Sequence, residues 1–413
     1  MTIQPVFQQN PPLCLYIHIP WCIRKCPYCD FNSHVFSKKS VDSQTLTIED
    51  EKYYIQALLS DLEQDLPLVW GRSIEHVFIG GGTPSLFSAA AFDQLLSGIR
   101  ARIPLKPFAE ITIEANPGTA EAARFQGYFD AGINRLSIGV QSFHNHQLKQ
   151  LGRIHDSTQA INAFQMARSA GFKQINIDLM YALPGQNVKQ ALSDLKQAIS
   201  LHPEHLSWYQ LTIEPNTHFY SSPPTLPSEE LSYQISEAGL RLLKQQGFTR
   251  YEVSAFARDN QISQHNLNYW QFGDYLGIGA GAHSKITHVP DNTILRRQKT
   301  RQPVTYLDPE KPFLAKEQSI NINELPLEFM LNALRLPKGV ETKLFQTHTG
   351  LNPQLIDPLV KKAMRKQLMQ NWPERIQTTE TGLAFLNDTL ALFFSDVIKV
   401  QPEQQAIPIT QIN

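Results

Sequence analysis

The first 250 residues alternate short apolar stretches with longer amphipathic ones, and this alternation constrains the fold more than any other feature. The apolar stretches are rich in Ile, Val, Leu, Phe and Tyr, which predicts β-strands at 13–19, 75–80, 110–115, 135–140, 174–179 and 205–213. Helical spacing predicts helices between and after them, at 51–66, 89–101, 120–131, 157–171, 187–200 and 228–246. Six strand–helix units in series predict an α/β fold with a parallel sheet covered by helices.

Polar motifs follow each of the six predicted strands. They are a cysteine-containing loop, GGGTP at 80–84, EANP at 114–117, Gln141-Ser142, Asp178 and Glu214-Pro215. The active sites of barrels and open α/β sheets form at the carboxyl ends of the strands, so these motifs are expected to meet. Their convergence favours a partial (β/α)6 barrel around a shared cavity over a doubly wound sheet.

The pattern changes after residue 250. Residues 251–257 are predicted to form one more strand, whereas 286–325 hold many polar residues and show little periodicity. Helical spacing resumes near residue 326 and continues to about residue 395. We therefore expect a core over 1–250, a connecting region over 251–325 and a smaller, mostly helical C-terminal domain over 326–413.

The four cysteines, at positions 14, 22, 26 and 29, are crowded near the N-terminus. A disulfide framework would spread its cysteines to close long loops, so this crowding favours a metal site in a reducing compartment. The sequence shows no signal peptide and no apolar run long enough for a membrane anchor. The net charge of −1 gives no indication of nucleic-acid binding. These features predict a cytoplasmic protein.

The cysteine-containing loop reads Cys22-Ile-Arg-Lys-Cys26-Pro-Tyr-Cys29. Three thiolates on one short loop can hold a [4Fe–4S] cluster and leave the fourth iron open to a ligand. Structural zinc is the alternative, with His18 and His34 nearby, but this spacing is unusual for zinc. Cys14 is interpreted as a small buried side chain on the first strand, with cluster ligation as its alternative.

Several residues at the predicted rim are suited to binding a small polar ligand. The GGGTP glycines are expected to leave backbone N–H groups free for a carboxylate or amine. Glu114 could accept hydrogen bonds from ribose hydroxyls, and Arg153 could pair with a carboxylate. Each of these residues, taken singly, is equally compatible with a structural role at a strand end.

The cysteine spacing resembles the signature of the radical S-adenosylmethionine (SAM) superfamily. Further motifs resemble the oxygen-independent coproporphyrinogen III oxidase family, namely IEANP at 113–117, SIGVQSF at 137–143, NIDLMYALPG at 176–185, GIGAGAHS at 277–284 and LEFMLNALRLPKGV at 327–340. The resemblance implies a [4Fe–4S] cluster on Cys22, Cys26 and Cys29. It also implies cofactor binding at Tyr16, Tyr28, Gly81, Gly82, Thr83, Glu114, Gln141, Arg153 and Asp178.

Two departures separate this sequence from the oxidase pattern. Phe31 stands where that pattern has a fourth cysteine, and only 21 residues precede Cys22. Both departures resemble the HemW branch, whose members are described as heme chaperones. The sequence His265-Asn-Leu-Asn-Tyr269-Trp270 matches the HNxxYW motif associated with heme in that branch. His265 is then a candidate heme ligand, with a structural histidine as the alternative and His283 as a weaker candidate.

The resemblance implies a protein that binds heme or porphyrin, passes heme to an acceptor protein and receives electrons from a donor. Membrane-bound heme acceptors are compatible with this role. No catalytic residue is assigned, and cleavage of SAM is left open. The alternatives are oxidative decarboxylation of coproporphyrinogen III and, ranked last, radical SAM methyl transfer or heme degradation.

Overall fold

The computed structural model describes residues 4–36, 46–118 and 122–394, and in this part of the chain it contains one large, open, mixed sheet. The strand order is β14-β13-β12-β11-β1-β4-β5-β6-β7-β8-β10-β9. The six predicted strands are β1 (Leu13–Ile19), β4 (Ile74–Gly81), β5 (Leu105–Ala115), β6 (Arg135–Gln141), β7 (Gln174–Tyr181) and β8 (His205–Gln210). These six pair in parallel in chain order, so the predicted α/β fold with a partial-barrel core is confirmed.

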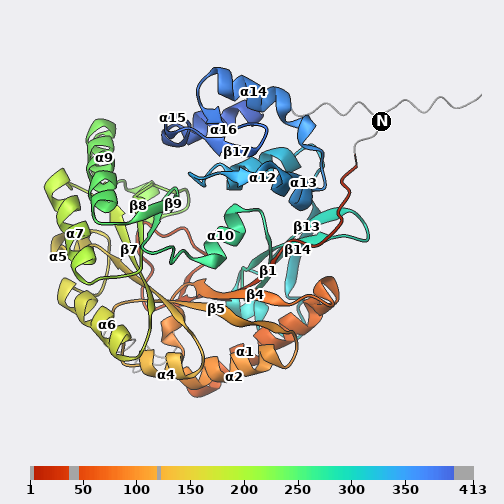
Figure 1. The fold of residues 1–413 in the computed structure, drawn as a ribbon. Coiled ribbons are helices and arrows are strands. Elements are labelled where there is room, and N and C mark those ends of the chain that lie inside the picture. Colours follow the sequence, from red (N-terminus) through yellow and green to blue (C-terminus); the bar gives the residue numbers. More distant parts are fainter. Residues whose placement is uncertain (1–3, 37–45, 119–121, 395–413) are drawn as a thin grey trace, which may run out of the picture.

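The predicted helices of the core pack on the outer face of the curved sheet (Figure 1). They are α1 (Ile48–Asp65), α2 (Ala89–Arg100), α4 (Phe125–Asp130), α6 (Ser157–Ser169), α7 (Val188–Ser200) and α9 (Glu229–Gln245). Thr47, Ser88, Asp156, Asn187 and Ser228 cap the N-termini of α1, α2, α6, α7 and α9 by accepting backbone N–H hydrogen bonds. The first two residues of the predicted helix 120–131 lie outside the described residues.

The prediction of a single strand at 251–257 is wrong. The chain forms two short antiparallel strands there, β9 (Thr249–Glu252) and β10 (Ala255–Ala257). A turn at 253–254 separates them, because the backbone N–H and hydroxyl of Ser254 both donate to Oε1 of Glu252 at 2.9 Å. A buried carboxylate that satisfies a turn in this way is a tertiary feature that strand propensity does not encode.

The region after residue 260 extends the same sheet. Helix α10 (Gln264–Trp270) is followed by β11 (Asp274–Ile278), β12 (His283–His288), β13 (Thr293–Lys299), α11 (Pro303–Tyr306) and β14 (Leu314–Ser319). β11 pairs in parallel with β1, and the next three strands add to it in antiparallel fashion. The sequence of β14 gives no strand signal because five of its six residues are exposed, so neither face needs to be apolar.

The C-terminal residues form a separate core above the open side of the sheet (Figure 1). This part contains α12 (Leu325–Ala333), α13 (Thr342–Thr349), α14 (Asp357–Arg365), α15 (Glu380–Ala384), α16 (Leu386–Phe394) and a small sheet of β15 (Val340–Glu341), β17 (Arg375–Thr378) and β16 (Met369–Gln370). Residues 395–413, the end of the predicted helical domain, lie outside the described residues.

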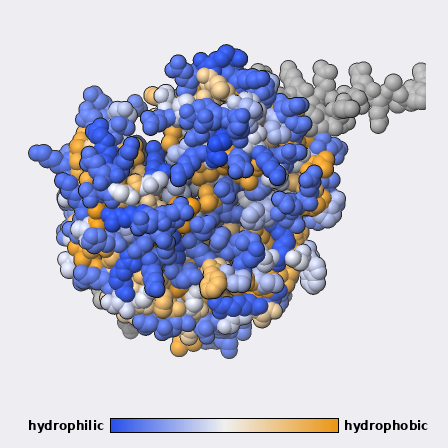
Figure 2. Space-filling model, viewed as in Figure 1, coloured by the Kyte–Doolittle hydropathy of each residue, from blue (hydrophilic) through white to orange (hydrophobic). Residues whose placement is uncertain are grey.

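The surface shown in Figure 2 is mostly hydrophilic, and its apolar residues form small separate groups. Among the described residues, no helix combines the length and apolarity needed to cross a membrane.

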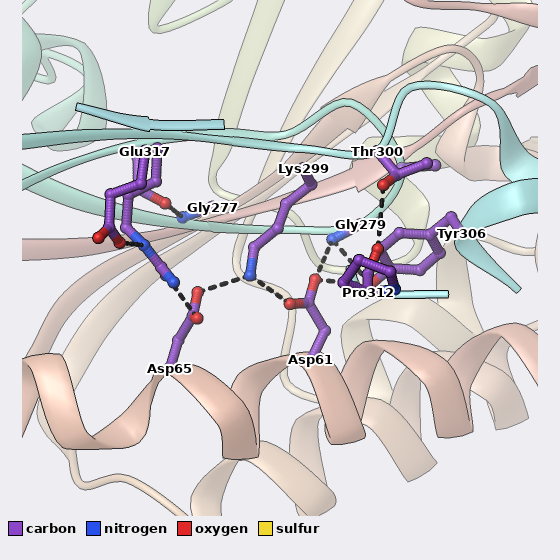
Figure 3. Close-up of polar contacts among 12 residues, drawn as sticks. Asp61, Asp65, Gly277, Gly279, Lys299, Thr300, Tyr306, Pro312 and Glu317 are labelled. Atoms are coloured by element: carbon purple, nitrogen blue, oxygen red, sulfur yellow. Dashed lines mark hydrogen bonds and ion pairs between the residues drawn. The ribbon is translucent and has the colours of Figure 1, made fainter. Parts of the chain in front are cut away.

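A buried network of charges joins helix α1 to strand β13 (Figure 3). The ammonium of Lys299, which is 1% exposed, pairs with Asp61 and lies 2.7 Å from Oδ2 of Asp65. Asp65 also pairs with Arg297, and Asp61 accepts a hydrogen bond of 2.6 Å from the hydroxyl of Tyr306. Burial raises the pKa of Asp61, against the lowering effect of Lys299. The network therefore depends on keeping its positive and negative charges matched.

Replacing Lys299 with Ala is expected to destabilise the protein by about 3–5 kcal/mol, because two buried carboxylates would lose their shared cation. The free energy of unfolding, measured by denaturant titration, would show the loss. Lys316→Ala, at an exposed position on β14, is the matched control and should change it by less than about 0.5 kcal/mol. Equal effects of the two substitutions would contradict the role given to the network.

Candidate functional site

A cavity of about 500 Å³ opens at the carboxyl ends of the parallel strands. It brings together most of the residues singled out in the sequence, which are Cys22, Cys26, Tyr28, Cys29, Gly81, Gly82, Thr83, Glu114, Gln141, Arg153 and Asp178. Tyr16 and His265 do not line it. We call this space the first cavity. The convergence of motifs from strands far apart in sequence follows from the parallel pairing, which points all the strand ends the same way.

The loop that carries the three cysteines leaves β1 through the short strand β2 (Trp21–Cys22) and returns through β3 (His34–Val35). Donors point at two of the sulfurs, with the Thr83 hydroxyl 3.4 Å from Sγ of Cys22 and Nη1 of Arg153 3.7 Å from Sγ of Cys26. Burial raises the pKa of the Cys22 and Cys29 thiols. Thiols of this kind stay protonated until a positive centre such as iron stabilises the thiolate.

The donor set fits a cluster of several irons. All four cysteines are free thiols, and Cys14 is completely buried, away from the cavity. Among the described residues, no three or more His, Cys, Asp or Glu side chains are grouped so as to bind one metal ion. A [4Fe–4S] cluster makes a different demand, since each thiolate binds its own iron and the sulfurs stand apart. Cys22, Cys26 and Cys29 therefore could hold such a cluster.

The GGGTP segment does not leave its backbone N–H groups free, contrary to the expectation from sequence. The N–H groups of Gly82 and Thr83 donate to the carbonyls of Ile19 and Trp21 at 2.7 Å, and that of Gly81 donates to Oε2 of Glu114 at 3.0 Å. These bonds fasten the segment to the start of the cysteine loop. A Cβ at Gly81 would lie 2.5 Å from the ring of His18, and one at Gly82 would lie 2.5 Å from the carbonyl oxygen of Trp21. The glycines are therefore required for close packing against that loop.

Two half-buried carboxyl groups, those of Glu114 and Asp178, face the first cavity. Burial and the nearby Asp178 raise the pKa of Glu114 to about 8, although the Gly81 N–H lowers it. Burial also raises the pKa of Asp178, which accepts hydrogen bonds from Ser137 at 2.8 Å and Asn176 at 2.7 Å. Near neutral pH, Glu114 can therefore either donate or accept a hydrogen bond.

Arg153 and Gln141 complete the polar wall of this cavity. Nη2 of Arg153 donates at 2.7 Å to both Oδ1 of Asn116 and the carbonyl of Gly139, whereas its buried Nε has no hydrogen-bond partner among the described residues. Gln141 has a φ of +69°, and its Oε1 accepts a 2.8 Å hydrogen bond from the hydroxyl of Tyr209. This Nε is enclosed by protein, so a carboxylate in the cavity would face the positive charge of the guanidinium and not this atom.

A second cavity, of about 530 Å³, adjoins the first and shares Asp30, Phe31, Gly81 and Glu114 with it. Its other side is lined by residues of β11–β13 and by Tyr16, His18, Phe78 and Tyr269. The structure therefore places Tyr16 beside the second cavity, where its hydroxyl lies 2.9 Å from Nδ1 of His18. Tyr275, His283 and Arg301 also line this space. Sequence reasoning missed Tyr275 and Arg301 because no motif marks them. The pairing of the later strands places them beside the second cavity.

Helix α10 lies in the middle of the molecule (Figure 1) and contributes side chains to both cavities. Its Asn266 and Trp270 line the first cavity, and its Tyr269 lines the second. The predicted common face of His265 and Tyr269 is present, since their rings meet edge to face at 4.7 Å.

His265 reaches neither cavity and is only 3% exposed. Its ring stacks on Phe78, with centroids 4.6 Å apart, and its Nδ1 has no hydrogen-bond partner among the described residues. Burial lowers the pKa of His265 to about 3, so the imidazole is neutral. Phe78 and Tyr269 thus stand between this imidazole and the open space of the second cavity.

Comparison with known proteins gives matches to two family models. Residues 16–198 match the radical SAM superfamily, and residues 321–385 match the HemN C-terminal domain. The heme chaperone HemW of Escherichia coli is 48% identical over 94% of this chain and 99% of its own length. The heme chaperone HemW of Haemophilus influenzae is 46% identical over the same shares. Among solved structures, coproporphyrinogen III oxidase (HemN) from Escherichia coli superposes with a TM-score of 0.76 at 23% identity, covering 94% of this chain and 91% of that one.

Proposed function

Since the chain belongs to the HemW family of radical SAM proteins, we propose that it is a heme chaperone that binds a [4Fe–4S] cluster, SAM and heme. It would pass heme to an acceptor protein and receive electrons from a separate donor. Its unpaired thiols favour a reducing compartment, and we propose the cytoplasm. The observation that carries the proposal is the position of α10, which contributes side chains both to the cysteine-lined cavity and to the cavity beside it.

The residues of the first cavity suit a cluster with SAM on its open iron. Cys22, Cys26 and Cys29 would hold the cluster, and the guanidinium of Arg153, which lines the cavity, would attract the carboxylate of SAM. Glu114, when ionised, would accept hydrogen bonds from the ribose or the amino group. SAM bound to a reduced cluster can supply an adenosyl radical. The chain's own contribution is to orient SAM and to keep its polar groups paired in a buried space.

The oxidase alternative rests on the motifs that resemble that family and on the likeness to HemN, which at 23% identity concerns the fold alone. Phe31 stands at the position of the fourth cysteine of the oxidase pattern. Its side chain is 59% exposed and lies at the edge shared by the two cavities. The chain thus lacks, at a position beside both cavities, the thiol that the oxidase pattern has.

The cluster proposal is tested by replacing each of Cys22, Cys26 and Cys29 with Ala. Each substitution is expected to lower the amount of iron and sulfide bound per protein after anaerobic reconstitution. It should also remove the brown absorption of the [4Fe–4S] cluster. Cys14→Ala is the matched control, because that thiol is buried away from the cavity, and it should keep a full cluster. A full cluster in all three variants would refute the assignment.

The role of Glu114 predicts a pH dependence of SAM binding. Because the pKa of this carboxyl is raised to about 8, it is mostly protonated at pH 7, and losing that proton makes it a stronger acceptor for SAM. The affinity should rise with pH, by at most about tenfold per unit below pH 8, and level off above it. Equilibrium binding of SAM to the reconstituted protein, compared with Glu114→Gln, isolates this effect from titration of SAM itself. If the affinity for SAM depended on pH in the same way in the parent protein and in Glu114→Gln, Glu114 would not have this role.

Chaperone and oxidase are separated by one pair of assays on the reconstituted protein. With SAM, reductant and coproporphyrinogen III, we expect no loss of substrate carboxyl groups, measured as carbon dioxide release. With heme, we expect stoichiometric binding followed by transfer to apomyoglobin, measured from the absorption of the product. Decarboxylation without heme transfer would assign the protein to the oxidases instead.

A further inference from the structure

The heme site is the part of the proposed function that motifs leave least defined. The motif histidine, His265, is covered by Phe78 and lies outside both cavities. The first cavity, at about 500 Å³, has the size of a site for one cofactor-sized ligand, and its polar wall suits SAM. Heme therefore needs other space, and the adjoining cavity of about 530 Å³ offers it.

We propose that heme binds in the second cavity, with His283 as its axial ligand and Arg301 pairing with a propionate. This inference rests on the proposed function, because it takes heme as the cargo, and it names the residues that would hold that cargo.

Three histidines come near this space, and hydrogen bonding distinguishes them. Nε2 of His18 lies 2.9 Å from the carbonyl oxygen of Asn32, which can only accept, so Nε2 carries the proton. Nδ1 of His18 then accepts from the hydroxyl of Tyr16, and neither nitrogen is left for iron. His265 keeps a free Nδ1, but its ring is buried under Phe78.

His283 meets both requirements of a ligand. It is the first residue of β12, its ring is exposed to the second cavity, and neither ring nitrogen has a hydrogen bond to any described residue. Partial burial and the nearby Arg296 and Arg301 lower its pKa, which favours the neutral imidazole that binds iron.

The rest of the cavity suits both the flat apolar macrocycle of heme and its carboxylates. Aromatic rings form one wall, with Tyr269 and Tyr275 4.5 Å apart and Tyr16 stacked on Phe78 at 6.3 Å, and such rings suit a flat apolar macrocycle. Arg301 is exposed and has no ion pair with any described residue, so its guanidinium is available for a carboxylate.

The charged side chains of the cavity bear on where the propionates of heme would lie. The acidic side chains of the cavity, Asp30 and Glu114, lie at the edge shared with the first cavity. We place the propionates at the guanidinium of Arg301, a cation that lines this cavity. Gln298 lies directly across from His283 in the β12–β13 register, which places an amide donor beside the ligand.

The ligand is tested by titrating heme into the reconstituted protein and into three histidine variants. His283→Ala is expected to shift the Soret band and to weaken heme binding by about tenfold or more. His288→Ala, which removes a histidine from the same strand outside the cavity, is the control and should match the parent protein. Free imidazole should restore the parent spectrum of His283→Ala, a rescue that a misfolded variant would not show.

The propionate contact is tested with Arg301→Gln and two ligands, heme and heme dimethyl ester. Arg301→Gln should weaken binding of heme by about tenfold and leave binding of the ester unchanged, since the ester has no carboxylate to pair. Arg241→Gln, at an exposed position on α9, is the matched control and should bind both ligands as the parent does.

The outcomes separate this inference from the proposed function. Loss of the parent Soret band in His265→Ala, with His283→Ala unchanged, would overturn the inference and leave a heme chaperone with the motif histidine as ligand. Absence of heme binding by the parent protein, with its cluster intact, would overturn the proposed function itself.

Discussion

The parallel pairing of β1 with β11 is the constraint on which the arrangement of both cavities depends. Residues 13–17 and 274–278 lie side by side although they are separated by most of the core. On its other edge β1 pairs with β4, so this one strand joins the radical SAM-like core to the later strands. The cysteine loop leaves the end of β1, which places it between the first cavity on one side and the second cavity on the other.

Hydrogen bonds and buried charges hold that dividing loop in place. The side-chain amide of Asn32 donates to the carbonyls of Ala280 at 3.0 Å and Arg301 at 2.9 Å, which ties the cysteine loop to the later strands. Asp61 accepts from the backbone N–H of Gly279 at 3.1 Å, so the charge network on α1 supports the same segment from behind. Because Asp61, Asp65 and Lys299 are buried and paired, a shift of α1 would leave buried charges without partners.

The two cavities differ in the chemistry of the side chains that line them. The first cavity has thiols, half-buried carboxyls and an arginine, which suit a charged, polar molecule. The second has aromatic rings, an accessible imidazole and an unpaired guanidinium, which suit a flat apolar molecule with carboxylates at one edge. Helix α10 contributes side chains to both cavities, so a movement of this helix would change the lining of each.

The sequence by itself determined the six parallel strands, their outer helices and the meeting of the cysteines with Glu114, Gln141, Arg153 and Asp178, because these follow from local periodicity and from the common direction of parallel strands. It also placed His265 and Tyr269 on one helix face, which depends only on helical spacing. Only the tertiary structure decided that the GGGTP N–H groups are occupied, that Phe78 covers His265 and that His283 and Arg301 share a cavity. These are contacts between segments distant in sequence, and they are set by which strands pair and how side chains pack.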